Sequence, residues 1–362
     1  SYPKPPEVEA ATIERLRSCG NPGRGGHRLS VESEGTLDAA RLALQRLLGG
    51  DSPRRFALTL NGTDALHLAI HAVLGARHDR PPHVVTTALE HNSVIRPVNH
   101  RVKAGAEATY VSPDPEGYLD PESIRKAIKP NTTLVIVNHG SNVSGVVQDL
   151  KAIGRVCREE GVPLAVDAAQ TAGVLPIDMS ENNISFLAFT GHKCLFGPPG
   201  TGGICVAEDA YIEGTIYGGT GVRSAHPYHL EEFPYRLEAG TLNMAGIAGL
   251  SAGVEWVKER GIESIHQHEM DLLALLQAGL SEIEGVTIHG TTSLVNRVPT
   301  LSVSVENYDA ADVGAFLDVD HDILTRTGLH CAPLLHEHYG TAPRGTVRFS
   351  IGPFNTRDQV LH

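Results

Sequence analysis

The sequence predicts an α/β fold in which a large, mostly parallel sheet is flanked by helices and a smaller α+β part follows. Three observations support this fold class. Short apolar runs alternate with helical periodicity from residue 56 to residue 206, which is typical of parallel sheets covered on both faces. The alternation fades after Gly246, where long helical segments come first and separate strands follow. Polar residues follow one strand after another, at the edge where such sheets bind ligands.

The N-terminal part is predicted to be helical. The proline-rich residues 1–6 do not start an element of their own, and a helix is expected over residues 7–18. A glycine-rich loop over residues 21–28 carries Arg24 and His27. A second helix, over residues 36–48, ends at Gly49 and Gly50, as helices often do at glycine.

Strands and helices then alternate. Each short apolar run bounded by turn-forming residues is predicted to be a buried strand. The predicted strands cover residues 56–60, 83–87, 108–111, 132–137, 163–166, 184–189 and 203–206. The predicted helices cover residues 64–74, 121–128 and 150–160, and another begins near residue 90.

A different pattern follows Gly246. Helices are expected over residues 247–260, 264–282 and 310–316, and strands over 286–289, 300–305 and 347–351. We interpret this α+β pattern as a second domain. The prediction is a large domain of residues 20–250 and a small domain formed by residues 1–19 and 251–362.

Charge and cysteine content limit the class of protein. The formal net charge of −12 argues against nucleic acid or an anionic membrane as the main partner. No apolar stretch has membrane-spanning length, and no secretory signal is recognised. An odd number of cysteines without metal-type spacing predicts a reduced, cytoplasmic setting and no metal site. These cysteines are Cys19, Cys157, Cys194, Cys205 and Cys331.

One lysine follows the apolar run of residues 184–189. Lys193 ends the segment Thr190-Gly191-His192-Lys193, and glycines and two prolines follow it. A stiff loop presents an amine in one geometry, which attack on a carbonyl carbon requires. Taken alone, Lys193 is equally well interpreted as a solvated loop residue.

Three other strand ends carry polar residues. Asn61-Gly62-Thr63 has the backbone N–H groups of an anion site, or it caps the helix that follows. Asp167 closes a buried strand, where a carboxylate needs a cation, unless it caps a helix or joins an internal ion pair. His91 can stack on a planar ring and carry protons, or it is a polar loop residue.

Together these residues match one cofactor. An anion-binding turn, a buried carboxylate, a flat side chain and an amine correspond to the phosphate, ring nitrogen, ring face and aldehyde of pyridoxal 5′-phosphate. Each signal is weak by itself, but their order and spacing make the combination specific.

The segments also resemble those of a known family, the class V, fold-type I pyridoxal-phosphate enzymes. The resemblance is strongest to cysteine desulfurases with a short cysteine loop, and it covers nearly the whole chain. Members of that family carry a further strand before the position of Ser1 and a C-terminal helix after Asn355-Thr356. The matching segments are Val166-Asp167-Ala168-Ala169-Gln170, Thr190-Gly191-His192-Lys193, Glu238-Ala239-Gly240-Thr241, Arg326-Thr327-Gly328-Leu329-His330-Cys331-Ala332 and Arg348-Phe349-Ser350.

The resemblance implies a role for each matching residue. Lys193 would form the Schiff base with the cofactor, and His91 would stack on its ring. Asp167 would pair with the ring nitrogen and Gln170 with the phenolic oxygen. Thr241 would reach the phosphate of a second subunit, which implies a homodimer with shared sites. The expected phosphate ligands are Gly62, Thr63, Thr190 and His192, and the expected substrate ligands are Asn142, Arg348, Arg326 and His330.

Cys331 decides the subclass. It lies in a loop bounded by Gly328 and Pro333, with His330 beside it and Arg326 upstream, where a thiol could have thiolate character. The resemblance implies attack of Cys331 on the sulfur of L-cysteine, with Lys193 or His91 removing the α-proton. The products would be L-alanine and a Cys331 persulfide, which passes to an acceptor protein or thiol.

Other functions stay open. A selenocysteine lyase or a cysteine or cystine C–S lyase would share most of these residues without needing Cys331. A transaminase or epimerase on the same scaffold would leave Cys331 unexplained. A non-catalytic sulfur-relay scaffold is disfavoured because the lysine, aspartate, phosphate-site and arginine positions are all filled.

Overall fold

The computed structural model describes residues 3–18, 20–23 and 26–362. Cys19 and Arg24, which the sequence analysis named, lie outside the described residues, as do Ser1, Tyr2 and Gly25. No helix within the described part is both long and apolar enough to span a bilayer.

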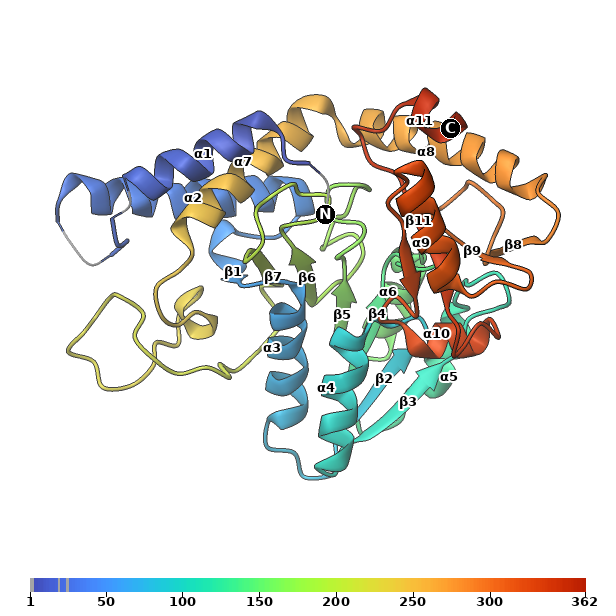
Figure 1. Cartoon of the computed structure of the whole chain (residues 1–362). Helices are drawn as coiled ribbons and strands as arrows, with labels where there is room; N and C mark the ends of the chain where they lie inside the picture. The colour runs from blue at the N-terminus through green and yellow to red at the C-terminus, as the bar shows by residue number, and fades with distance from the viewer. Residues whose placement is uncertain (1–2, 19, 24–25) are drawn as a thin grey trace.

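A seven-stranded sheet forms the centre of the larger part of the molecule (Figure 1). Its strand order is β1-β7-β6-β5-β4-β2-β3, with β7 antiparallel to both neighbours and the other pairs parallel. The predicted mostly parallel sheet is therefore confirmed. Its strands are β1 (Phe56–Thr59), β2 (His83–Thr87), β3 (Glu107–Val111), β4 (Thr132–Asn138), β5 (Leu164–Asp167), β6 (Phe186–Thr190) and β7 (Gly202–Val206).

Helices cover both faces of this sheet. Successive residues of a strand point to opposite faces, so Leu134 packs into one apolar cluster and Val135 into the other. The first face is covered by α3 (Gly62–Gly75) and α4 (Asn92–Lys103) (Figure 1). The second face is covered by α1 (Pro6–Arg17), α2 (Arg28–Leu48), α5 (Pro121–Ala127), α6 (Leu150–Glu159) and α7 (Met244–Arg260).

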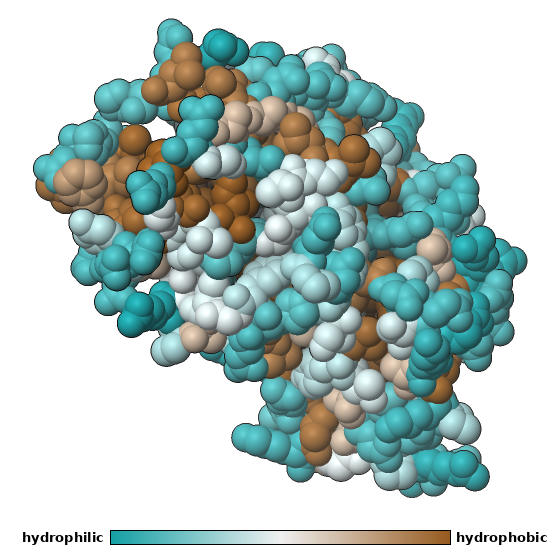
Figure 2. All heavy atoms as spheres, turned by 90° about the vertical axis from the view of Figure 1, so that its right-hand side faces the viewer, coloured by the Kyte–Doolittle hydropathy of each residue, from teal (hydrophilic) through white to brown (hydrophobic). Residues whose placement is uncertain are grey.

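A second, antiparallel sheet has the order β10-β11-β9-β8. It packs with α8, α9 and α11 around its own apolar cluster. Viewed from this side, the surface is mostly hydrophilic with several apolar patches (Figure 2). The elements are α8 (Ile262–Ser281), β8 (Val286–His289), β9 (Thr300–Val305), α9 (Ala310–His321), β10 (Arg326–Gly328), α10 (Pro333–His338), β11 (Thr346–Ser350) and α11 (Arg357–Leu361).

Some element bounds differ from the prediction. Helix α2 begins at Arg28, not at residue 36, because Ser30 and Ser33 are buried and polar residues on the inward face hide the apolar periodicity. Helix α9 ends at His321, beyond the predicted end at residue 316. Its last turn carries Val319, which is 82% exposed, so the apolar periodicity does not continue to the end of the helix. The short elements β10, α10 and α11 were not predicted, because segments of three to six residues show no period.

The predicted domain division stays a prediction. Helix α7 is continuous from Met244 to Arg260, across the predicted boundary at residue 250, and α1 packs against it.

Candidate active site

The predicted site residues gather at the carboxyl ends of the parallel strands. β4 and β5 end side by side, with Asn138 opposite Asp167, and a cavity of about 330 Å³ opens above them. Parallel strands bring their ends to one edge of the sheet, so residues far apart in the sequence meet there. The predicted residues that line this cavity are Gly62, Thr63, His91, Asn142, Asp167, Gln170, Thr190, His192, Lys193, Arg326 and Arg348.

Lys193 lies in a tight turn after β6. Its carbonyl accepts the N–H of Phe196 at 3.0 Å, and the N–H of Gly191 bonds to the carbonyl of Thr201 at 2.9 Å. A Cβ at Gly191 would lie 2.2 Å from Thr201 Oγ1, so only glycine allows this close approach. Burial lowers the pKa of Lys193, and the charge of Asp167 works against that fall. The amine is therefore more easily deprotonated than a surface lysine, as a nucleophile or base requires.

Asp167 supplies a buried carboxylate. It is 3% exposed, and its Oδ1 accepts the N–H of Ala169 at 2.9 Å. Among the described residues it has no ion-pair partner within 4.0 Å. A cation that reached this carboxylate would satisfy it.

A second carboxyl group, that of Glu90, lies close by and is fully buried. Burial raises its pKa to about 8, and the nearby Asp167 adds to the rise. Glu90 Oε1 accepts bonds from Thr87 Oγ1 at 2.7 Å and from the N–H of Asn138 at 2.9 Å. Its Oε2 atom is buried without a hydrogen-bond partner. Burial thus favours the neutral form of Glu90, which directly precedes His91 in the chain.

The turn Asn61-Gly62-Thr63 caps a helix, as one of its two sequence interpretations predicted; anion binding at this turn stays a prediction. Helix α3 starts at Gly62, and Asn61 Oδ1 accepts the N–H of Asp64 at 2.9 Å. On another side of the cavity, Thr190 Oγ1 and His192 Nδ1 lie 3.1 Å apart. A helix N-terminus faced by hydroxyl and imidazole groups favours a phosphate.

His91 caps helix α4 with its ring. Its Nδ1 accepts the N–H of Ser93 at 3.0 Å and lies 2.8 Å from Ser93 Oγ. The same hydroxyl lies 2.7 Å from Thr63 Oγ1. A chain of polar atoms therefore joins the His91 ring to the anion-binding turn.

Two arginines and Asn142 form the other wall of the cavity. Arg348 Nη1 donates to the Asn142 carbonyl at 3.0 Å, and Asn142 Nδ2 donates to the His330 carbonyl at 2.6 Å. Asn142 Oδ1 is buried without a partner. The substrate-side residues are thus bonded to the loop that carries Cys331.

Cys331 is half-buried beside Arg326, whose Nη2 lies 3.3 Å from its Sγ. Both His330 and Cys331 have positive φ, 49° and 61°, a strained conformation for residues with a Cβ. The loop is held by the N–H of Asn92, which donates to the Cys331 carbonyl at 2.7 Å. The Arg326 guanidinium is thus placed to donate a hydrogen bond to the Cys331 sulfur.

Three predicted residues lie outside the cavity lining: Cys331, His330 and Thr241. Cys331 contacts Arg326, which does line it. The buried ring of His330 bonds to Thr346 Oγ1 at 2.9 Å through Nε2, so it faces the small sheet. Thr241 lines a separate hollow together with Glu238 and Arg41.

Sequence reasoning missed Ser93 and Asn138, which also line the cavity. Asn138 was detectable as the polar residue that ends a predicted strand. Ser93 carried no comparable signal, because serine is common in the first turn of any helix.

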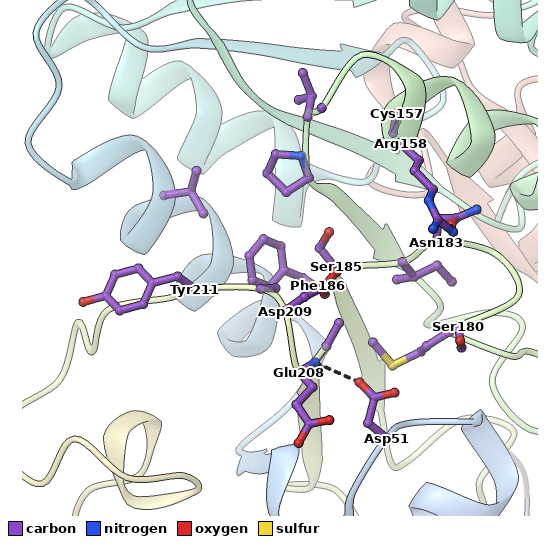
Figure 3. Close-up of a pocket in the computed structure, with 18 residues that line it drawn as sticks. Asp51, Cys157, Arg158, Ser180, Asn183, Ser185, Phe186, Glu208, Asp209 and Tyr211 are labelled. Atoms are coloured by element: carbon purple, nitrogen blue, oxygen red, sulfur yellow. Dashed lines mark hydrogen bonds between the residues drawn. The ribbon is translucent and has the colours of Figure 1, made fainter.

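A larger hollow, about 660 Å³, lies at the opposite, amino-terminal edge of the sheet (Figure 3). It is bordered by the acidic Asp51, Glu208 and Asp209, and Arg158 there bonds to Asn183 Oδ1 at 2.9 Å. None of the described buried polar atoms that lack a partner lines it. Among the described residues, this hollow therefore has no unpaired buried polar atom that a ligand would satisfy.

The match to known proteins agrees with this geometry. The family model of the class-V aminotransferases matches residues 1–362. The chain belongs to the class-V aminotransferase family. The family predicted from the sequence is thus confirmed, and so is its fold.

Several relatives of this chain have a more specific name, cysteine desulfurase. A probable cysteine desulfurase of Methanothermobacter thermautotrophicus is 34% identical over 98% of this chain and 88% of its own length. A cysteine desulfurase of Pectobacterium atrosepticum is 29% identical over 98% and 87%. The apo structure of the cysteine desulfurase from Thermococcus onnurineus has a TM-score of 0.92 and 33% identity, and the match covers all of this chain and 90% of that one.

Members of this family depend on pyridoxal 5′-phosphate, and the cavity fits that cofactor. The Asp167 carboxylate has no ion-pair partner within 4.0 Å among the described residues, and the half-buried Lys193 lines the same space. The unpartnered Asn142 Oδ1 and Asn138 Oδ1 are further polar atoms at the cavity. A helix N-terminus, a carboxylate and an amine suit the phosphate, ring nitrogen and aldehyde.

Proposed function

We propose that this chain is a cysteine desulfurase that converts L-cysteine to L-alanine and leaves the sulfur as a persulfide on Cys331. One observation carries the proposal: the Cys331 thiol lies against the Arg326 guanidinium, at 3.3 Å, and Arg326 lines the cavity that holds Lys193 and Asp167. The relatives named as cysteine desulfurases support it.

The cofactor, when bound, supplies an electron sink conjugated to the substrate α-carbon. Lys193 would hold its aldehyde carbon, Asp167 its ring nitrogen and Gln170 its phenolic oxygen, while His91 would stack on the ring. The phosphate would be held by Gly62, Thr63, Thr190 and His192, all of which line the cavity.

The arginines and Asn142 would orient the substrate. Arg348 suits the substrate carboxylate because a guanidinium binds it through two parallel hydrogen bonds. Asn142 keeps one amide hydrogen for this task, since the other is used by the His330 carbonyl. The same contact fixes the loop that presents Cys331, so bound substrate and nucleophile share one support.

Sulfur transfer exchanges the C–S bond of the substrate for an S–S bond to Cys331. The Cys331 thiolate attacks the substrate sulfur, so an S–S bond forms and the C–S bond breaks. The electron pair of the broken bond stays with the substrate carbon, which takes up a proton and becomes the methyl group of alanine. An acceptor thiol or protein must remove the persulfide sulfur before the next turnover.

We also propose a cytoplasmic homodimer with shared sites. The position of Thr241 supports it, because this residue lies in a separate hollow, away from the cavity of its own subunit. Light scattering should give twice the chain mass, and a Thr241→Ala variant should release the cofactor faster. A monomer with full cofactor affinity would contradict the shared site.

The direct test measures alanine and sulfide from L-cysteine, with pyridoxal phosphate and a reductant present. Cys331→Ala should keep the cofactor absorbance and lose sulfide release by at least about a hundred-fold. Cys157→Ala, which removes a buried thiol of α6 far from the cavity, serves as the matched control. Full activity of Cys331→Ala would favour a lyase, and parallel assays with selenocysteine and cystine would then identify its substrate.

A further inference from the structure

The ring of His91 is fixed from one side by the backbone of helix α4. The N–H of Ser93 points at Nδ1 with a donor–acceptor distance of 3.0 Å. A backbone N–H can only donate, so Nδ1 must present its lone pair to it. A neutral imidazole has one N–H, and in this geometry that hydrogen must be on Nε2.

We infer that His91 is held as a neutral imidazole with its proton on Nε2, and that Ser93 is the positioning residue that imposes this tautomer. His91 therefore enters the reaction as a hydrogen-bond donor through Nε2–H, and it cannot be the base that removes the α-proton. Of the two candidate bases for that step, Lys193 remains. The inference rests on the proposed function for its catalytic meaning, although the tautomer itself does not depend on it.

The surroundings of His91 disfavour the imidazolium form. Protonated Nδ1 would oppose the N–H of Ser93, and the N-terminus of a helix favours negative charge rather than positive. Burial lowers the pKa of His91, and the charges of Lys193, Arg326 and Arg96 lower it further, against the opposing effect of Asp167.

The Ser93 hydroxyl adds a second connection. It lies between His91 Nδ1 at 2.8 Å and Thr63 Oγ1 at 2.7 Å. Whichever way these hydroxyl hydrogens point, the backbone N–H of Ser93 keeps Nδ1 an acceptor. The hydroxyl holds the orientation of the ring relative to the anion-binding turn, so its loss should affect the chemical step more than substrate binding.

The tautomer can be read without any activity. Protein labelled with ¹⁵N-histidine is examined with and without pyridoxal phosphate in a long-range ¹H–¹⁵N spectrum, and the signals that vanish in His91→Gln belong to His91. We expect a pyridine-like shift for Nδ1 and a pyrrole-like shift for Nε2, unchanged between pH 6 and 8. The reverse assignment, or an imidazolium pattern at pH 7, would overturn the inference.

Variants of Ser93 test the positioning role. Ser93→Ala should lower kcat about five-fold, the value of one ordinary hydrogen bond, with little change in KM, and Ser93→Thr should restore most of the rate. Ser123→Ala removes a hydroxyl from the first turn of α5 and should have no effect. If Ser93→Ala kept both the full rate and the wild-type pH profile, the positioning role would be wrong. If the tautomer is found but no alanine forms, the proposed function fails and the assignment of His91 stands.

Discussion

Replacing Glu90 by glutamine should make the protein more stable at alkaline pH. Glutamine keeps the carbonyl oxygen that accepts from Thr87 Oγ1 and from the N–H of Asn138. It also removes the charge that Glu90 would otherwise acquire in a fully buried position. The variant therefore has the shape of the protonated carboxyl group and cannot ionise.

The magnitude follows from the pKa of Glu90, which burial raises from 4.5 to about 8 in the folded protein. Folding takes up a proton between these values, so the stability that the neutral acid contributes is complete below pH 4.5 and is lost as the pH rises to about 8. The difference between these two pKa values corresponds to about 4 to 5 kcal/mol over this window.

Urea unfolding between pH 5 and pH 9, followed by circular dichroism, measures the effect. The free energy of unfolding of Glu90→Gln minus that of the wild type should increase by several kcal/mol from pH 5 to pH 9. Glu14→Gln, which alters an exposed carboxylate of α1, is the control. A difference between Glu90→Gln and the wild type that stays constant with pH would refute the reasoning.

Two further changes test packing outside the cavity. Arg41 donates two hydrogen bonds, of 2.9 and 2.8 Å, to the buried carboxylate of Glu238. In urea unfolding, Arg41→Met should lower the free energy of unfolding by about 3 to 5 kcal/mol, because it leaves that carboxylate buried without a cation. Adding Glu238→Gln to this variant should recover most of the lost stability. A Cβ at Gly253 would lie 2.2 Å from the carbonyl oxygen of Leu195, two residues after Lys193. Gly253→Ala should therefore lower the free energy of unfolding by about 1 to 3 kcal/mol. It should also speed the loss of the cofactor, measured as a decrease in cofactor absorbance. Gly279→Ala, with nothing within 4 Å, should gain up to about 1 kcal/mol, and an equal loss in both glycine variants would contradict the contact.

Strong local periodicity made most of the fold predictable. Strands β2, β8 and β9 have the predicted bounds, since each is a short run with turn-forming residues on both sides. Prediction failed where burial contradicts residue type. The first turns of α2 bury serines instead of apolar side chains, and β10 is too short to show a period.

The site was predictable to the extent that polar residues end strands. Lys193, Asp167 and His91 were found in this way, and the structure brings them to one cavity. The contact of Asn142 with the His330 carbonyl joins residues 188 positions apart, and no local pattern encodes such a pair. For the same reason the sequence placed His330 beside the substrate, whereas its ring faces Thr346.

The sequence by itself determined the order of the elements and the chemical groups available at the sheet edge, because both depend on residue type and spacing along the chain. Only the tertiary structure decided which atoms meet. It set the Arg326 guanidinium against the Cys331 thiol, bound His91 Nδ1 to the Ser93 N–H, and separated Thr241 from the cavity. Hydrogen-bond partners depend on distances and directions of a few tenths of an ångström and a few tens of degrees, and these arise only when distant segments pack together.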